Sequence, residues 1–121
     1  MHMSVLDHPV GFGDEMPQDE ERLSTLVATL NELADVQTIR ACAGHKKPID
    51  SHVQDNEFEV HLAVAGTTEA WASIKRIADA CEIIGPAQLS AESDNGEFAF
   101  HLFGFVGLEP DDLAATIRAN G

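Results

Sequence analysis

The spacing of apolar residues along the chain predicts three helices. Apolar side chains that recur every three or four positions form one face of an α-helix. The first helix begins at Pro17, with acids in its first turn, and carries Leu23, Leu26, Val27, Leu30, Leu33 and Ala34. The second follows a cap at 66–69, ends at Gly85-Pro86 and carries Trp71, Ile74, Ile77, Ala78 and Cys81. The third begins at 109–112 and carries Leu113, Ala114 and Ile117.

Alternation of apolar and polar residues predicts four strands, at 36–42, 57–65, 87–93 and 97–103. Asn95-Gly96 separates the last two, and this dipeptide favours the turn of a β-hairpin. A turn at that dipeptide pairs Leu89 with Leu102 on the apolar face and Ser90 with His101 on the other.

The predicted order αββαββα is typical of an α+β fold, a two-layer α/β sandwich. Its mostly antiparallel four-stranded sheet has the helices on one face. The length of 121 residues suits a single domain over 18–121, preceded by an irregular arm over 1–17. Alternation then places Cys42, His61 and His101 on the uncovered face. Cys42 shares its side with Thr38 and Arg40, opposite Ile39 and Ala41.

The strongly negative net charge argues against some classes of binding partner for this protein. Seven Lys and Arg residues stand against 21 Asp and Glu residues, a formal charge of −14. Such a surface repels phosphate backbones and anionic lipids, so we expect no direct nucleic-acid or membrane partner. The acidity fits either a solvated surface, as in salt adaptation, or a decoy for the basic groove of a protein partner. Two cysteines in different contexts and no apolar leader favour a reduced, cytoplasmic location.

The candidate chemistry centres on Cys42-Ala43-Gly44-His45, where a strand ends and a polar loop over 43–56 begins. Thiolate and imidazole are zinc ligands, so one hypothesis is a zinc site formed by Cys42 and His45 with His61 or His101, with water in the open fourth position. A second makes Cys42 a catalytic nucleophile activated by His45 or His101. The alternative to both is that the histidines are ordinary polar residues facing solvent.

The same loop gathers positive charge. Arg40, Lys46 and Lys47 are three of the seven bases, and such a patch in an acidic protein is suited to a phosphate or carboxylate. The turn at Gly44 can add backbone N–H groups, and His52 lies in the same loop. These residues, with His61 and His101, predict a binding site for an anionic small molecule.

Part of the chain resembles a known family. A helix over 23–36 leads into a strand that ends in Thr38-Ile39-Arg40-Ala41-Cys42-Ala43-Gly44, and a helix and a hairpin follow over 69–105. This is similar to the opening of Tyw3-like proteins, which take part in wybutosine synthesis on transfer RNA. The family pattern Ser-Ser-Cys-Ser-Gly-Arg corresponds here to Arg40-Ala41-Cys42-Ala43-Gly44-His45, without the flanking serines or the final arginine. The resemblance implies a methyltransferase that uses S-adenosylmethionine. The Cys-x-Gly-His turn is also similar to one in small uncharacterised bacterial and phage proteins.

Three functions therefore remain open. The first is a small-molecule-binding domain with its site at the 42–52 loop. The second is an enzyme in which Cys42 and His45 are catalytic or bind a metal. The third is an acidic inhibitor, for instance one encoded by a phage. Trp71 and Cys81 are expected in the core, and Phe103 and Phe105 are candidates for an interface such as that of a homodimer.

Overall fold

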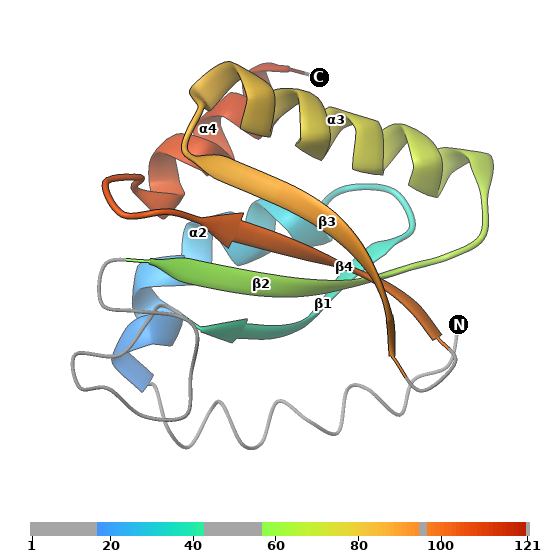
Figure 1. The fold of residues 1–121 in the computed structure, drawn as a ribbon, viewed down its shortest axis with the longest axis horizontal. Helices are drawn as coiled ribbons and strands as arrows, with labels where there is room; N and C mark the ends of the chain where they lie inside the picture. The colour runs from blue at the N-terminus through green and yellow to red at the C-terminus, as the bar shows by residue number, and fades with distance from the viewer. Residues whose placement is uncertain (1–16, 43–56, 95–96, 121) are drawn as a thin grey trace.

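The computed structural model describes residues 17–42, 57–94 and 97–120, which form three helices and one four-stranded sheet (Figure 1). The elements are α2 (Pro17–Asn31), β1 (Val36–Cys42), β2 (Phe58–Val64), α3 (Thr68–Ile84), β3 (Ala87–Asp94), β4 (Glu97–Gly104) and α4 (Pro110–Ala119). The predicted α+β class and the predicted order of elements are confirmed. In these described ranges no helix is both long enough and apolar enough to cross a membrane.

The sheet has the strand order β1-β2-β4-β3, and each neighbouring pair is antiparallel. The helices lie on one face, and their apolar side chains form a common core with alternate residues of the strands. That core includes Leu23, Leu26, Leu30, Ile74, Ile77, Leu113 and Ile117 from the helices and Val60, Leu62, Phe100 and Leu102 from the strands. Removal of this apolar surface from water is the main stabilising contribution to the fold.

The β3–β4 hairpin has the register that the Asn-Gly dipeptide predicts. Leu89 pairs with Leu102, and Ser90 pairs with His101. The turn itself, at 95–96, lies outside the described residues. This register matters for function because it determines which β3 side chains lie beside His101.

Helix α2 ends at Asn31, three residues before the end that the apolar spacing indicates. The Asn31 side chain accepts a hydrogen bond from the Thr38 backbone N–H at 2.9 Å and donates one to Thr38 Oγ1 at 3.0 Å. Asp35 adopts a left-handed conformation with φ 59°. The chain therefore turns directly into β1, although Leu33 in that turn is still buried.

Strand β1 contains a bulge that corrects one prediction. Thr38 pairs with Leu62, whereas Arg40, two residues later, pairs with the next residue of β2, His61. The extra residue shifts the alternation, so Thr38 lies on the helix-covered face while Arg40 and Cys42 lie on the other. The expectation that all three share one side is wrong for Thr38, because alternation alone does not reveal a bulge.

The prediction that Trp71 lies in the core is wrong, since 70% of its surface is exposed. The face of α3 that is buried instead carries Ala70, Ser73, Ile74, Ile77, Ala80 and Cys81. The buried Ser73 hydroxyl donates a hydrogen bond to the Ala34 carbonyl at 2.8 Å and anchors this face to the turn before β1. Trp71 and the exposed Ala78 lie next to this buried face of α3 and not on it. The burial expected for Cys81 is confirmed.

Candidate metal centre

The face of the sheet opposite the helices carries most of the predicted site residues that the structure describes. Strand pairing arranges them in two adjacent rows across β1, β2 and β4: Arg40, His61 and His101 in one row, and Cys42, Glu59 and Phe103 in the next. Residues paired directly across antiparallel strands have Cβ atoms about 4.5–5.5 Å apart. The side chains in these rows are therefore neighbours on one surface.

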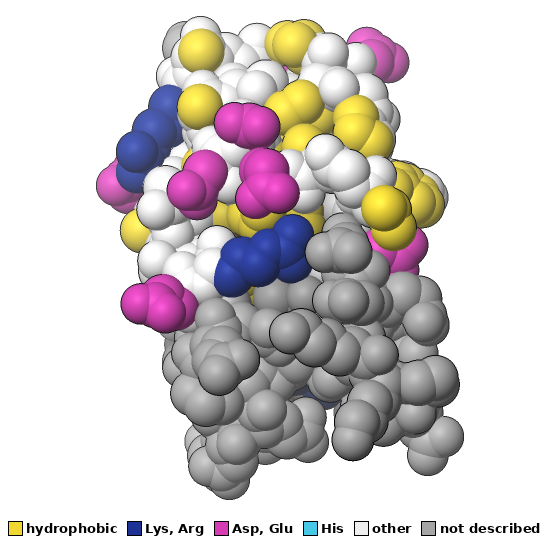
Figure 2. All heavy atoms as spheres, turned by 90° about the vertical axis from the view of Figure 1, so that its left-hand side faces the viewer, with side chains coloured by type: hydrophobic (Ala, Val, Ile, Leu, Met, Phe, Trp, Pro, Cys, Tyr) yellow, Lys and Arg dark blue, Asp and Glu magenta, His cyan; other side chains and the backbone are white. Residues whose placement is uncertain are grey.

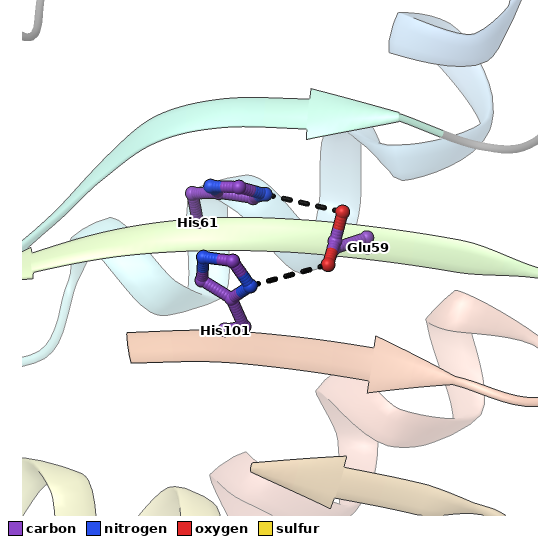
Figure 3. Close-up of side chains that lie close together, drawn as sticks. All are labelled: Glu59, His61 and His101. Carbon is purple, nitrogen blue, oxygen red and sulfur yellow. Dashed lines mark ion pairs between the residues drawn. The ribbon is translucent and has the colours of Figure 1, made fainter. Parts of the chain in front are cut away.

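Three of these side chains converge. Glu59 Oε1 lies 3.1 Å from His61 Nε2, and Glu59 Oε2 lies 3.3 Å from His101 Nδ1. Figure 3 shows the carboxylate beside the two imidazole rings, with one oxygen toward each. The rings also pack against each other, with centroids 3.8 Å apart and planes inclined by 36°. We call these three residues the Glu-His-His cluster.

Local sequence and strand register together create this cluster. Glu59 and His61 are two positions apart on β2, so their side chains leave the strand on the same side. His101 is the direct partner of His61 on β4. The buried residues Val60 and Leu102 point to the opposite face and hold both strands against the core. The cluster therefore stands on two central strands, which is a rigid support.

The cluster has little contact with solvent. Glu59 is 6% exposed, and the side chains of His61 and His101 are 18% and 15% exposed. The expectation that these histidines face solvent is therefore wrong, while the alternative that they are ordinary polar residues without a ligand is not tested by their burial. A carboxylate with so little access to water has a large desolvation cost unless it is paired or binds a metal. Here the two imidazoles provide the pairing.

These residue types and separations suit a metal ion. One ligand atom from each of the three residues can be chosen so that all lie within 4.8 Å of one another. Zinc bonds of about 2.0–2.2 Å at tetrahedral angles place ligand atoms about 3.3–3.6 Å apart. The nitrogen–oxygen separations of 3.1 and 3.3 Å are close to that range, and each runs to a different oxygen of the Glu59 carboxylate. Two imidazoles and a carboxylate are also a ligand set found in zinc enzymes.

The ligand set differs from the one predicted from the sequence. His61 and His101 are in the cluster, but within the described ranges the third convergent ligand is Glu59 and not Cys42. Cys42 is half-buried and lies directly across from Glu59 in the neighbouring strand. The other predicted site residues lie outside the described residues, so their roles stay predictions. They are Gly44, His45, Lys46, Lys47 and His52.

Glu59 carries no sequence signal of its own, since it is one of 21 acids. The informative pattern is Glu-x-His on a strand, whose period of two places both side chains on one face. A second histidine then becomes adjacent only through pairing with another strand. That pairing joins residues 40 positions apart, His61 and His101.

Positive charge next to the cluster comes from Arg40. Arg40 is exposed and lies directly across from His61 in the neighbouring strand. Four other described cations have partners: Arg22 with the Glu57 carbonyl, Lys75 with Asp79, Arg76 with the end of α4 and Arg118 with Glu32. In the part of the chain that the structure describes, Arg40 is the cation for which no hydrogen bond or ion pair is found.

An apolar surface lies at the end of the molecule that carries the β4–α4 loop (Figure 2). Phe105 and Val106 in this loop and Ile83 near the end of α3 are exposed. Acidic side chains lie among the apolar ones on this face. Phe103 packs edge-to-face against Phe105, with ring centroids 4.9 Å apart. The homodimer interface expected at these two aromatic residues stays a prediction.

Comparisons with family models, curated proteins and solved structures found no significant match to this chain. The resemblance to Tyw3-like proteins therefore stays a prediction, as does the methyltransferase activity that it implies. Function has to be argued from the residues of the site.

Proposed function

We propose that this protein binds one divalent transition-metal ion, with zinc the best fit, through Glu59, His61 and His101. The observation that carries the proposal is the convergence of one carboxylate and two imidazoles on a weakly exposed surface of two rigid strands. Zinc prefers nitrogen ligands with a carboxylate, whereas Mg²⁺ and Ca²⁺ prefer sites built from oxygen atoms. The two histidines therefore favour zinc or a related transition metal.

We further propose that an anionic small molecule completes the coordination. Three protein ligands leave the fourth position of a tetrahedral zinc ion for water or another ligand. Arg40, next to His61 in the same row, can pair with a carboxylate or phosphate of a molecule held there. This proposal keeps the anionic ligand expected from the sequence but places it at the Glu-His-His cluster.

The first test measures zinc binding by isothermal titration calorimetry and elemental mass spectrometry, on tag-free protein stripped with a chelator. We expect one zinc ion per chain in the wild type. His61→Gln, His101→Gln and Glu59→Gln each remove a ligand while keeping a polar side chain of similar size. Loss of an outer-shell partner weakens metal binding about 10- to 100-fold, and we expect loss of a direct ligand to weaken it by about 100-fold or more. Circular dichroism and thermal melting check that each variant folds.

Two matched variants separate this site from the predicted alternatives. His45→Gln removes the other loop residue of the predicted zinc set, and Cys42→Ser removes the thiol across from Glu59. Both are expected to keep the wild-type affinity. Loss of binding in Cys42→Ser with full binding in Glu59→Gln would restore the cysteine-containing ligand set. A wild-type protein that takes up no stoichiometric zinc would overturn the proposal.

A second candidate function is hydrolysis at the bound zinc ion. The observation that favours it is the count of three protein ligands, which is typical of catalytic rather than structural zinc sites. A metal-bound water at that position is a nucleophile near neutral pH. The test is hydrolysis of p-nitrophenyl acetate and p-nitrophenyl phosphate with and without zinc. Hydrolysis that requires zinc and is lost in His101→Gln supports catalysis, whereas binding without turnover leaves the ligand-binding function.

A further inference from the structure

A second carboxylate contacts the Glu-His-His cluster from the outer strand of the hairpin. Glu92 Oε2, on β3, lies 3.0 Å from His101 Nε2. His101 Nδ1 on the other side of the ring lies 3.3 Å from Glu59 Oε2. The ring of His101 is thus held between two carboxylates, one on each nitrogen.

The hairpin register brings Glu92 to this position. Glu92 pairs directly with Ala99, two residues before His101 on the same face of β4. Diagonal neighbours across antiparallel strands are about 7–8 Å apart, which is within the reach of a long side chain. The small side chain of Ala99 leaves room for the glutamate to extend over it toward the imidazole.

We infer that Glu92 is a positioning residue for metal binding: it accepts a hydrogen bond from His101 Nε2–H and turns Nδ1 toward the metal. This inference rests on the proposed metal site. A histidine that binds a metal through one nitrogen commonly donates its other N–H to a carboxylate, which fixes the tautomer and orientation of the ring. Because Nδ1 faces Glu59 and Nε2 faces Glu92, the metal-binding nitrogen is Nδ1 and the hydrogen remains on Nε2.

Glu92 is far more exposed than Glu59, and this difference separates the role of a positioning residue from that of a metal ligand. The Glu92 side chain is 45% exposed, while that of His101 is 15% exposed. Glu92 can therefore be replaced without leaving a buried charge unpaired. Its removal is expected to change the freedom of the His101 ring and to leave the core intact.

The experiment compares zinc affinity in Glu92→Ala, Glu92→Gln and a charge-matched control, Glu82→Ala. Glu82 is an exposed acid on α3, so its replacement removes the same charge away from the site. Competition with a chromophoric chelator gives the dissociation constants. Loss of a partner of this kind weakens metal binding about 10- to 100-fold. We expect this loss in Glu92→Ala, a smaller loss in Glu92→Gln, whose amide oxygen still accepts the hydrogen bond, and wild-type affinity in Glu82→Ala.

A second readout follows the tautomer directly. Long-range ¹H–¹⁵N NMR of the zinc-bound wild type is expected to show His101 with its hydrogen on Nε2, and a mixed or altered pattern in Glu92→Ala. Zinc affinity within about twofold of wild type in Glu92→Ala, or an equal loss in Glu82→Ala, would overturn the inference while the metal site stands. Absence of zinc binding in the wild type would overturn the metal site and this inference together.

Discussion

Glu59 shows how the role of a single residue depends on what faces it across the sheet. In the sequence it is one of 21 Asp and Glu residues, and no motif distinguishes it from the others. In the folded protein it is 6% exposed and has an imidazole nitrogen near each carboxylate oxygen. That environment makes it the carboxylate ligand in the proposed metal site, in which the sequence had suggested a cysteine ligand, Cys42.

The two cysteines differ in the same way. Burial raises the pKa of the Cys81 thiol from its ordinary value of 9.0 to about 11. Thiols react as thiolates, so Cys81 is an inert part of the core. Cys42 is half-buried and lies directly across from Glu59, so the thiol chemistry predicted from the sequence concerns Cys42 and not Cys81.

The raised pKa of Cys81 predicts a loss of stability in alkaline solution. Between about pH 9 and 11 the unfolded chain loses the thiol proton that the folded chain keeps, so the free energy of unfolding falls as the pH rises. The expected loss is about 1–2 kcal/mol, allowing for partial screening by solvent. Urea denaturation over this pH range measures it in the wild type and in Cys81→Ala.

The difference between those two proteins isolates the thiol, and the absence of tyrosine removes another group that titrates in the same range. Cys81→Ala should lose less stability than the wild type as the pH increases. Parallel curves for the wild type and Cys81→Ala would contradict the assignment.

At the scale of elements, the contact between β2 and the end of β4 depends on a glycine. Gly104 pairs with Phe58, and the space that a Cβ atom would occupy is filled by the Phe58 ring. Phe58 is fully buried, so its ring has little freedom to move aside. The glycine therefore permits the close packing that seats β4 against β2 beside the cluster.

Gly104→Ala tests this packing. Overfilling a packed core typically costs about 1–3 kcal/mol, and we expect a decrease of that size in the free energy of unfolding. Gly66→Ala is the control, because a Cβ atom there meets no neighbour within 4 Å. Chemical denaturation measures both variants, and equal stability of the two would show that the Phe58 ring yields without cost.

Most of the elements were predictable because their signals are local. The apolar spacing of α2 and α4, the alternation in β2 and the Asn-Gly dipeptide of the hairpin all act within a few residues. The bulge in β1 and the outward position of Trp71 were not predictable in this way. Both involve contacts with other parts of the chain. Thr38, beside the bulge, is hydrogen-bonded to Asn31 of α2, and the buried face of α3 is hydrogen-bonded through Ser73 to the Ala34 carbonyl.

At the scale of the whole molecule, the charge of −14 predicts a stability that depends on salt. Mutual repulsion of carboxylates destabilises a compact acidic protein, and salt screens it. As the ionic strength rises from about 10 mM to about 150 mM, the screening length falls from about 30 Å to about 8 Å. We expect the Tm to rise by about 2–5 °C in sodium chloride. A neutral solute of equal osmolality controls for effects unrelated to charge, and a Tm that falls with added salt would show that attractive ion pairs dominate.

By itself the sequence determined the class of fold, the limits of most elements, the hairpin register and the shared face of Cys42, His61 and His101. Those features follow from residue periodicity and turn chemistry, which operate over short distances along the chain. Only the tertiary structure decided that Glu59 joins the two histidines, that Glu92 reaches His101 and that Trp71 is exposed. These outcomes depend on which strands pair and in which register, because a metal site needs atoms within a few ångströms that the chain carries far apart.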